Sequence, residues 1–420
     1  GRGGVGAVMG SKNLKAIGVK GTNPIEVFNL LELRKKLKEL SPSIKGVADE
    51  YRPHGTIYIV DLADEHGVLA ANNFQKTVYN VAADKVGYKA FKDYLISDTV
   101  CFNCPVACGK LLEAKREPYK GIRADLDYEL IWALGPNCGI YDLSPIIAAV
   151  NYCDETGMDG ISAGVVTGFA MELYEKKILT INDIGGVGLK FGSDEAMMTL
   201  LNMIAERRGI GDILAEEVYE AALRIGKGAI HYAMHSKRQS FTGWEPRGMT
   251  GMALAFATSN RGACHNVGGW TGREELIAET VDKFGSKGKA QIVKMAQDTR
   301  AFIDSLGICT YMRSPLGFKG ETPNADILSL VTGIDFSNKL LLIGERIYNL
   351  ERLILTKEGI TRKDDNLPER IKSEKILVKG VETRFDNTML QTMLNEYYSL
   401  RGWDERGIPT KETLQRLDVL

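Results

Sequence analysis

The sequence of 420 residues contains no run of about 18 apolar residues and no signal-like start, so nothing in it predicts a membrane-spanning helix or secretion. It contains no internal repeat and no low-complexity tract, which excludes repeat architectures. The formal net charge of -1 gives no overall attraction to nucleic acid or to an anionic membrane. We therefore expect a cytoplasmic protein that binds neither.

Disulfides are not expected either, although the chain has seven cysteines. The count is odd and three of the cysteines are clustered, which is more typical of a metal site in a reducing compartment. Apolar residues make up 44% and charged residues 25% of the chain, as in ordinary globular proteins. At this length, two or three domains can each bury a core.

The first 24 residues are rich in glycine, and we predict a loop and a strand there, not a helix. Gly1 opens directly into this loop without an initiator Met, so we expect the chain to be incomplete or processed at this end. Residues 56–60 fit either a strand or a buried helix, and periodicity does not separate the two.

Helical periodicity fills most of the remaining chain, so we predict a mainly α fold. The capping residues Ser193 and Gly226 mark one helix start and one helix end. The predicted helices cover residues 26–40, 144–157, 193–208, 212–226, 287–305, 337–358 and 386–400. Turn formers around Pro246 interrupt the helices at 237–250, where we predict a boundary between two helical domains, 25–236 and 237–420.

The segment CFNCPVAC places Cys101, Cys104 and Cys108 at a spacing that lets three thiolates converge on one iron–sulfur cubane. A 4Fe-4S cluster needs a fourth ligand, and we select Cys309, which follows a predicted helix end. Other candidates for the fourth ligand are Cys138, Cys153 and Cys264. Structural zinc is the alternative, but no second Cys-x2-Cys pair is present.

Eight segments, in order along essentially the whole chain, resemble the tungsten-containing aldehyde ferredoxin oxidoreductase family. They are GRGGVGAVMGSKNLKAI, CFNCPVAC, YELIWALGPNCGI, DETGMD, GDILAE, WEPRG, ATSNRGACH and DSLGIC. The resemblance implies that residues 1–24 are the end of an N-terminal pterin-binding domain whose remainder is absent here. It also implies a tungsten (or molybdenum) bis-molybdopterin cofactor, with Mg as a possible link between the pterin phosphates.

In this family each pterin is held by a D-x-x-G-hydrophobic-D/C loop. The matching residues are Asp154, Gly157, Met158 and Asp159 in the first loop, and Asp304, Gly307 and Ile308, followed by Cys309, in the second. The opening loop matches the phosphate contact segment with Arg2, Gly3, Gly4, Gly6 and Lys12. A carboxylate can accept the paired N–H groups of a pterin, and glycine lets backbone amides approach a phosphate. Without the resemblance, each D-x-x-G loop is more typical of a helix C-cap with a nearby acid, and the opening loop of a simple glycine-rich turn.

The resemblance also implies two catalytic residues. Glu129 matches the active-site glutamate, which we interpret as a general base for water or for the aldehyde hydrate. His265 matches a histidine that orients the substrate oxygen or the oxygen at the metal. From the pattern alone, Glu129 beside Asp127 could be a solvated acid, and a lone histidine could be structural. We interpret Cys138 and Cys264, close to these residues in sequence, as buried thiols.

The expected activity converts an aldehyde and water to a carboxylic acid and passes two electrons through the cluster to ferredoxin. The alternatives are a related low-potential reductase and an iron–sulfur electron-transfer subunit without tungsten. Because most of the N-terminal domain is absent, the fragment could be inactive alone, or a separate subunit could supply that domain. The helix SPIIAAVNYC lacks the family's E-x-x-H motif, so a metal-bridged dimer is not expected, whereas a homodimer with other contacts stays open.

Overall fold

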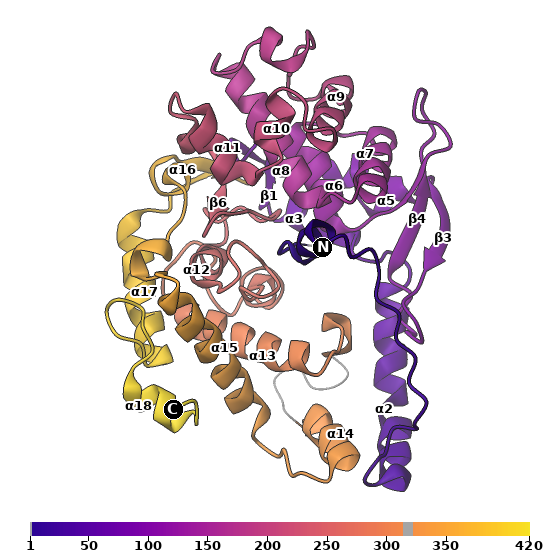
Figure 1. The fold of residues 1–420 in the computed structure, drawn as a ribbon, viewed down its shortest axis with the longest axis vertical. Helices are drawn as coiled ribbons and strands as arrows, with labels where there is room; N and C mark the ends of the chain where they lie inside the picture. The colour runs from indigo at the N-terminus through magenta and orange to yellow at the C-terminus, as the bar shows by residue number, and fades with distance from the viewer. Residues whose placement is uncertain (1, 314–321) are drawn as a thin grey trace.

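The computed structural model describes residues 2–313 and 322–420, so Gly1 lies outside the described residues. The fold is mainly α, as predicted: 52% of the residues are helical and 8% are in strands. Figure 1 shows α7 to α11 gathered toward one end of the molecule, α14 and α18 toward the other, α12, α13, α15 and α17 between them, and α2 along one edge. In the described residues no helix is both long and apolar enough to cross a membrane.

The described α-helices are α1 (Val5–Ser11), α2 (Leu30–Tyr51), α3 (Tyr58–Glu65), α4 (Ala82–Val86), α5 (Tyr88–Phe91), α6 (Tyr128–Leu134), α7 (Leu143–Thr156), α8 (Gly160–Glu175), α9 (Asp194–Ala205), α10 (Ile210–Leu214), α11 (Glu217–Ile225), α12 (Thr250–Thr258), α13 (Lys289–Ser305), α14 (Thr322–Thr332), α15 (Leu340–Lys357), α16 (Glu369–Ser373), α17 (Asn387–Arg401) and α18 (Lys411–Arg416). Four small antiparallel sheets pair β1 (Leu69–Ala71) with β2 (Lys76–Val78), β4 (Gly109–Glu113) with both β3 (Leu95–Thr99) and β5 (Arg123–Asp125), β6 (His235–Ser236) with β7 (Gln239–Ser240), and β8 (Ile376–Val378) with β9 (Val381–Thr383).

The opening segment differs from the prediction of a loop and a strand, because Val5–Ser11 forms α1 and no strand occurs in residues 2–24. Gly3 and Gly4 have positive φ angles of 102° and 76°, which glycine adopts readily, and they turn the chain into this helix. All seven residues of α1 lie outside the core, so no periodic burial signals the helix in the sequence. Residues 56–60 enter α3, which decides that ambiguity in favour of a helix.

Most predicted helices are confirmed, and their caps explain their ends. The side chain of Ser193 accepts a hydrogen bond from the N–H of Ala196 and starts α9, as predicted. Gly226 ends α11, although the predicted helix 212–226 is divided into α10 and α11. The helix predicted at 26–40 begins later, at Leu30, and extends to Tyr51 despite Pro42 inside it.

One large hydrophobic core joins residues from Ile57 to Trp403, and a smaller one lies around Phe302 and Ile303. The segment 237–250 is largely buried within the fold, and the domain boundary proposed there stays a prediction.

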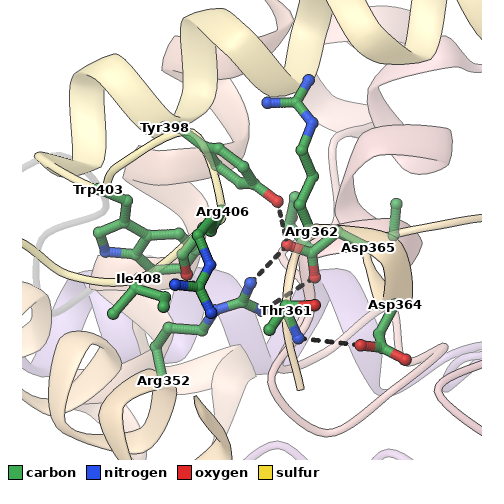
Figure 2. A network of polar contacts seen from close by, with 12 residues as sticks. Arg352, Thr361, Arg362, Asp364, Asp365, Tyr398, Trp403, Arg406 and Ile408 are labelled. Atoms are coloured by element: carbon green, nitrogen blue, oxygen red, sulfur yellow. Dashed lines mark hydrogen bonds and ion pairs between the residues drawn. The ribbon is translucent and has the colours of Figure 1, made fainter. Parts of the chain in front are cut away.

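A buried ionic network around Asp365 stabilises the β6–β7 hairpin. Asp365 accepts hydrogen bonds of 2.9 and 2.7 Å from Arg352 and a shorter one from Tyr398, as Figure 2 shows. Lys237, in the turn between β6 and β7, places Nζ 2.8 Å from Oδ1 of the same aspartate. These contacts anchor the β6–β7 hairpin, and the chain then continues into the residues that contact Glu129.

Candidate active site

Glu129 lies in the first turn of α6, which Asp127 caps by accepting a hydrogen bond of 3.0 Å from the N–H of Leu130. The Glu129 carboxyl group is buried, and its Oε2 accepts a hydrogen bond of 2.9 Å from the N–H of Gly243. Only 6% of the residue is exposed, so the alternative of a solvated acid is wrong. Burial raises the pKa of Glu129 to about 8, a range suited to a general base near neutral pH.

His265 lies in the loop after α12, and its Nδ1 is 3.1 Å from Oε1 of Glu129. The two atoms are not aligned for a hydrogen bond, and both are buried without another partner. Burial lowers the pKa of His265 to about 3, and three nearby arginines, Arg2, Arg300 and Arg261, act in the same direction. The fold therefore brings the two predicted catalytic residues together, with the imidazole neutral.

A third polar group lies near Glu129 and His265, the indole N–H of Trp244, which was not predicted from the sequence. The Trp244 ring is 1% exposed and packs against Tyr128, with ring centroids 5.2 Å apart. Its Nε1 lies close enough to Glu129 to lower the pKa of the carboxyl group, but it makes no hydrogen bond. Trp244 belongs to the motif WEPRG, which was the only sequence signal for it.

Arg2 connects the opening loop to the first predicted pterin loop. Its side chain is 5% exposed, and its Nε donates to Oδ2 of Asp159 at 3.3 Å. The same guanidinium donates to the carbonyl oxygen of Ser240 at 2.7 Å and to that of Ala263 at 3.2 Å. Arg2 thus joins Asp159 to the β6–β7 hairpin and to the loop that carries His265.

The other predicted residues of the opening loop lie at the surface. Gly3 and Gly4 are exposed before α1, Gly6 is exposed within it, and Lys12 follows the helix with an exposed side chain. A β-carbon built on Gly3, Gly4 or Gly6 meets no atom within 4 Å, so the loop has an open face.

The two predicted pterin loops have the same backbone hydrogen bonds. In the first loop the N–H of Gly157 donates to the carbonyl three residues earlier at 3.3 Å, and that of Met158 to the carbonyl five residues earlier at 2.8 Å. In the second loop Gly307 and Ile308 repeat these bonds at 3.1 and 3.4 Å. Met158 and Ile308 each pack against a hydrophobic core, which holds both loops in place.

Both loops also present an open face. Gly157 and Gly307 have φ of 71° and 68°, and a β-carbon built on either would meet no atom within 4 Å. Asp154 and Asp304 are exposed, with carboxyl groups accessible to a ligand. Gly157 is therefore the C-cap of α7, and its open face also leaves room for a bound group.

The four cysteines chosen as cluster ligands gather in one region. Burial raises the pKa of the Cys108 thiol, and the charges of Cys309, Cys104 and Cys101 raise it further, so each of the three is within electrostatic reach of Cys108. By contrast, the three cysteines considered as other candidates are buried, namely Cys138, Cys153 and Cys264. For Cys138 and Cys264 this confirms the prediction of buried thiols.

The end of α2 holds the two cysteine segments together. Arg52, which follows α2, donates from its guanidinium to the carbonyl oxygen of Pro105 at 2.7 Å, inside the Cys101–Cys108 loop. Tyr51 packs against Tyr311, two residues after Cys309, with ring centroids 4.4 Å apart. Distant parts of the sequence thus meet at one place.

The chain matches a known protein family. Residues 32–419 match the family model described as aldehyde ferredoxin oxidoreductase, domains 2 and 3. The chain belongs to the aldehyde ferredoxin oxidoreductase family. It is therefore a member of an oxidoreductase enzyme family, as the motifs predicted.

Relatives of this aldehyde ferredoxin oxidoreductase family member support the assignment. A tungsten-containing aldehyde ferredoxin oxidoreductase of Pyrococcus horikoshii is 39% identical over 100% of this chain and 69% of the relative. The protein of the same name from Pyrococcus furiosus is 37% identical with the same coverage. A protein of Pyrococcus furiosus named aliphatic sulfonate oxidoreductase, WOR-like subunit, is 31% identical over 100% of this chain and 66% of its own length.

A solved structure shares the fold. The active-site complex of a benzoyl coenzyme A reductase with 1,5-dienoyl-CoA superposes with a TM-score of 0.78 and 24% identity, covering 100% of this chain and 69% of that chain.

Within residues 2–313 and 322–420, no group of three or more His, Cys, Asp or Glu side chains forms a site for one metal ion.

Proposed function

We propose that this chain oxidises aldehydes to carboxylic acids at a tungsten bis-molybdopterin centre and passes the electrons through a 4Fe-4S cluster to ferredoxin. One observation carries the proposal: the pair of Glu129 and His265 is connected to both predicted pterin loops. Arg2 links the His265 loop to Asp159 in the first loop, and Arg300 links it to Asp304 in the second.

The residues present fit a bis-pterin cofactor. The open faces at Gly157 and Gly307, each beside an exposed aspartate, suit two similar ligands. The exposed N–H groups of the loop around Gly3 and Gly4 suit the phosphates and an Mg ion linking them. When bound, the tungsten, or molybdenum in its place, supplies the two-electron oxidation.

Glu129 then acts as the general base. As a carboxylate it removes a proton from water or from the aldehyde hydrate, and its pKa near 8 makes it a stronger base than a solvated glutamate. His265 remains neutral and orients the substrate oxygen with its Nδ1–H, which lies 3.1 Å from Oε1 of Glu129 without making a hydrogen bond to it. The unpaired N–H of Trp244 is a second donor for that oxygen, because a buried donor without a partner gains most from a bound acceptor.

The four gathered cysteines suit a 4Fe-4S cluster. Its ligands bind separate irons at the corners of a cube, so their spacing differs from that around a single ion. Cys309 directly follows Ile308 of the second pterin loop, which provides a short route for electrons from the cofactor to the cluster. Ferredoxin is the proposed acceptor, in accordance with the names of the relatives.

Metal and pterin analysis of the full-length protein, followed by turnover of a short and an aromatic aldehyde with a viologen acceptor, tests this function. We expect about one tungsten, two pterins and four irons per chain. Iron without tungsten would favour the electron-transfer subunit. A loaded protein that turns over neither aldehyde would favour the related low-potential reductase.

A further inference from the structure

We propose that Asn266 and Arg300 are positioning residues that fix the tautomer of His265, with the ring proton on Nδ1, the nitrogen nearest Glu129. This inference rests on the proposed function for its catalytic meaning, but the tautomer itself follows from contacts among four side chains. Three of them, Glu129, His265 and Arg300, come from separate segments of the sequence.

Arg300 determines which way the Asn266 amide faces. Its Nη1 donates to Oδ1 of Asn266 at 3.3 Å. A guanidinium has only donors, so the amide oxygen must face Arg300 and the amide nitrogen must face the other way. Arg300 lies on α13 with a side chain 19% exposed, and its Nε is 2.8 Å from Oδ1 of Asp304 in the second predicted pterin loop.

Asn266 in turn determines the state of the imidazole. Its Nδ2 lies 3.1 Å from Nε2 of His265. An amide nitrogen only donates, so Nε2 must accept this hydrogen bond and carries no proton. A neutral imidazole has one ring proton, which must therefore reside on Nδ1, 3.1 Å from Oε1 of Glu129.

The charges around His265 keep the ring neutral. Arg2 from the opening loop, Arg261 from the loop after α12 and Arg300 from α13 all disfavour an imidazolium. Glu129 from α6 is the acidic group that faces the ring. Gly243 donates to Oε2, and Nδ1–H lies 3.1 Å from Oε1 without an aligned hydrogen bond, so both oxygens of the carboxylate have donors nearby.

The chain of contacts also connects His265 to the second pterin loop. Arg300 and Asp304 line a cavity of about 220 Å³ with Tyr348 and Glu351. A shift of Asp304 would therefore move Arg300, release the Asn266 amide and free the imidazole to change tautomer. One series of contacts, from Asp304 through Arg300 and Asn266, thus joins this loop to His265.

Nuclear magnetic resonance with ¹⁵N-labelled histidine tests the proposal in the oxidised full-length holoenzyme. This chain has only five histidines, and the His265 signals are those lost in His265→Gln. We expect a protonated Nδ1 and an unprotonated Nε2 in the wild type. In Asn266→Asp, which keeps the side-chain shape but offers an acceptor, we expect the proton to move to Nε2, with kcat reduced about 10- to 100-fold and KM within about threefold.

The matched control is Asn260→Asp in the same loop, whose side chain contacts the carbonyl oxygen of Tyr348 and Glu351. It should leave the His265 signals unchanged. Arg300→Gln should give a mixture of tautomers, and Arg300→Lys should restore the wild-type signals at least in part. A wild-type Nε2–H tautomer, or one that does not respond to Asn266→Asp, overturns the proposal. Absence of tungsten or of aldehyde turnover would instead contradict the proposed function and leave the tautomer result standing.

Discussion

The backbone N–H of Gly243 donates a hydrogen bond of 2.9 Å to Oε2 of Glu129, and this contact joins the first turn of α6 to the chain after the β6–β7 hairpin. In return, the hydroxyl of Tyr128 donates to the carbonyl oxygen of Gly243 at 2.7 Å. The two bonds hold the carboxyl group in place, although its burial disfavours the charged form.

The first prediction concerns pH. Glu129 acts as a base only when it is deprotonated, so kcat/KM should rise with pH through about 8 and level off above that value. Glu129→Gln should abolish this dependence and reduce turnover about 100-fold or more, with unchanged tungsten content. Asp127→Asn is the control: it should keep the pH-dependent turnover, since asparagine also caps a helix. Turnover of Glu129→Gln within about threefold of wild type would show that Glu129 is not the base.

The second prediction concerns the indole N–H of Trp244. Trp244→Phe keeps an aromatic ring against Tyr128 but removes the unpaired donor, so kcat/KM for aldehydes should fall about 10- to 100-fold. Trp403→Phe is the matched control, because its Nε1 donates to Asn349 at 2.6 Å. That variant should lose stability and keep its activity. Equal kinetics of Trp244→Phe and wild type would exclude a role in substrate binding.

The third prediction tests the fourth cluster ligand. Cys309→Ser should lower iron and acid-labile sulfide and remove the electron paramagnetic resonance signal of the reduced cluster, because a cubane needs a ligand for each iron. Cys138→Ala removes a buried thiol instead and should retain all of the iron. If both variants kept the same iron content, another residue would have to complete the site.

The fourth prediction concerns a close backbone approach. Gly55 has φ of 57°, and a β-carbon built on it would clash with the carbonyl oxygen of Cys108. Gly55→Ala should therefore displace the cysteine loop and lower both the iron content and the free energy of unfolding. Gly121 has φ of 86°, and a β-carbon built on it meets no atom within 4 Å. Gly121→Ala is therefore the control that measures the cost of backbone strain alone, about 1–3 kcal/mol. Equal losses in the two variants would argue against the steric explanation.

The fifth prediction separates the two roles of Asp159. Its side chain caps α8 and accepts a hydrogen bond from Arg2. Asp159→Asn keeps the capping ability and removes the charge, so the melting temperature should change little while pterin content falls. Asp386→Asn, at the start of α17, is the control and should keep its pterin. Full pterin content in Asp159→Asn would remove this residue from the cofactor site.

Local patterns predicted the helices well because caps and periodicity act within a few residues. Ser193 and Gly226 marked helix ends that the structure contains. The prediction was wrong for α1, because a seven-residue helix without a buried residue has no buried face to give a periodic signal. Residues 56–60 were ambiguous because a short apolar run fits a strand and a helix equally well until its neighbours are known.

The sequence by itself determined the mainly α fold, the family and the candidate residues, since spacings such as Cys-x2-Cys-x3-Cys and D-x-x-G are local. Only the tertiary structure decided that Glu129 is buried, that His265 contacts it and that Asn266 and Arg300 orient the imidazole. The physical reason is that desolvation and hydrogen-bond direction depend on groups far apart in the chain. Their relative positions are set by packing, which no local pattern contains.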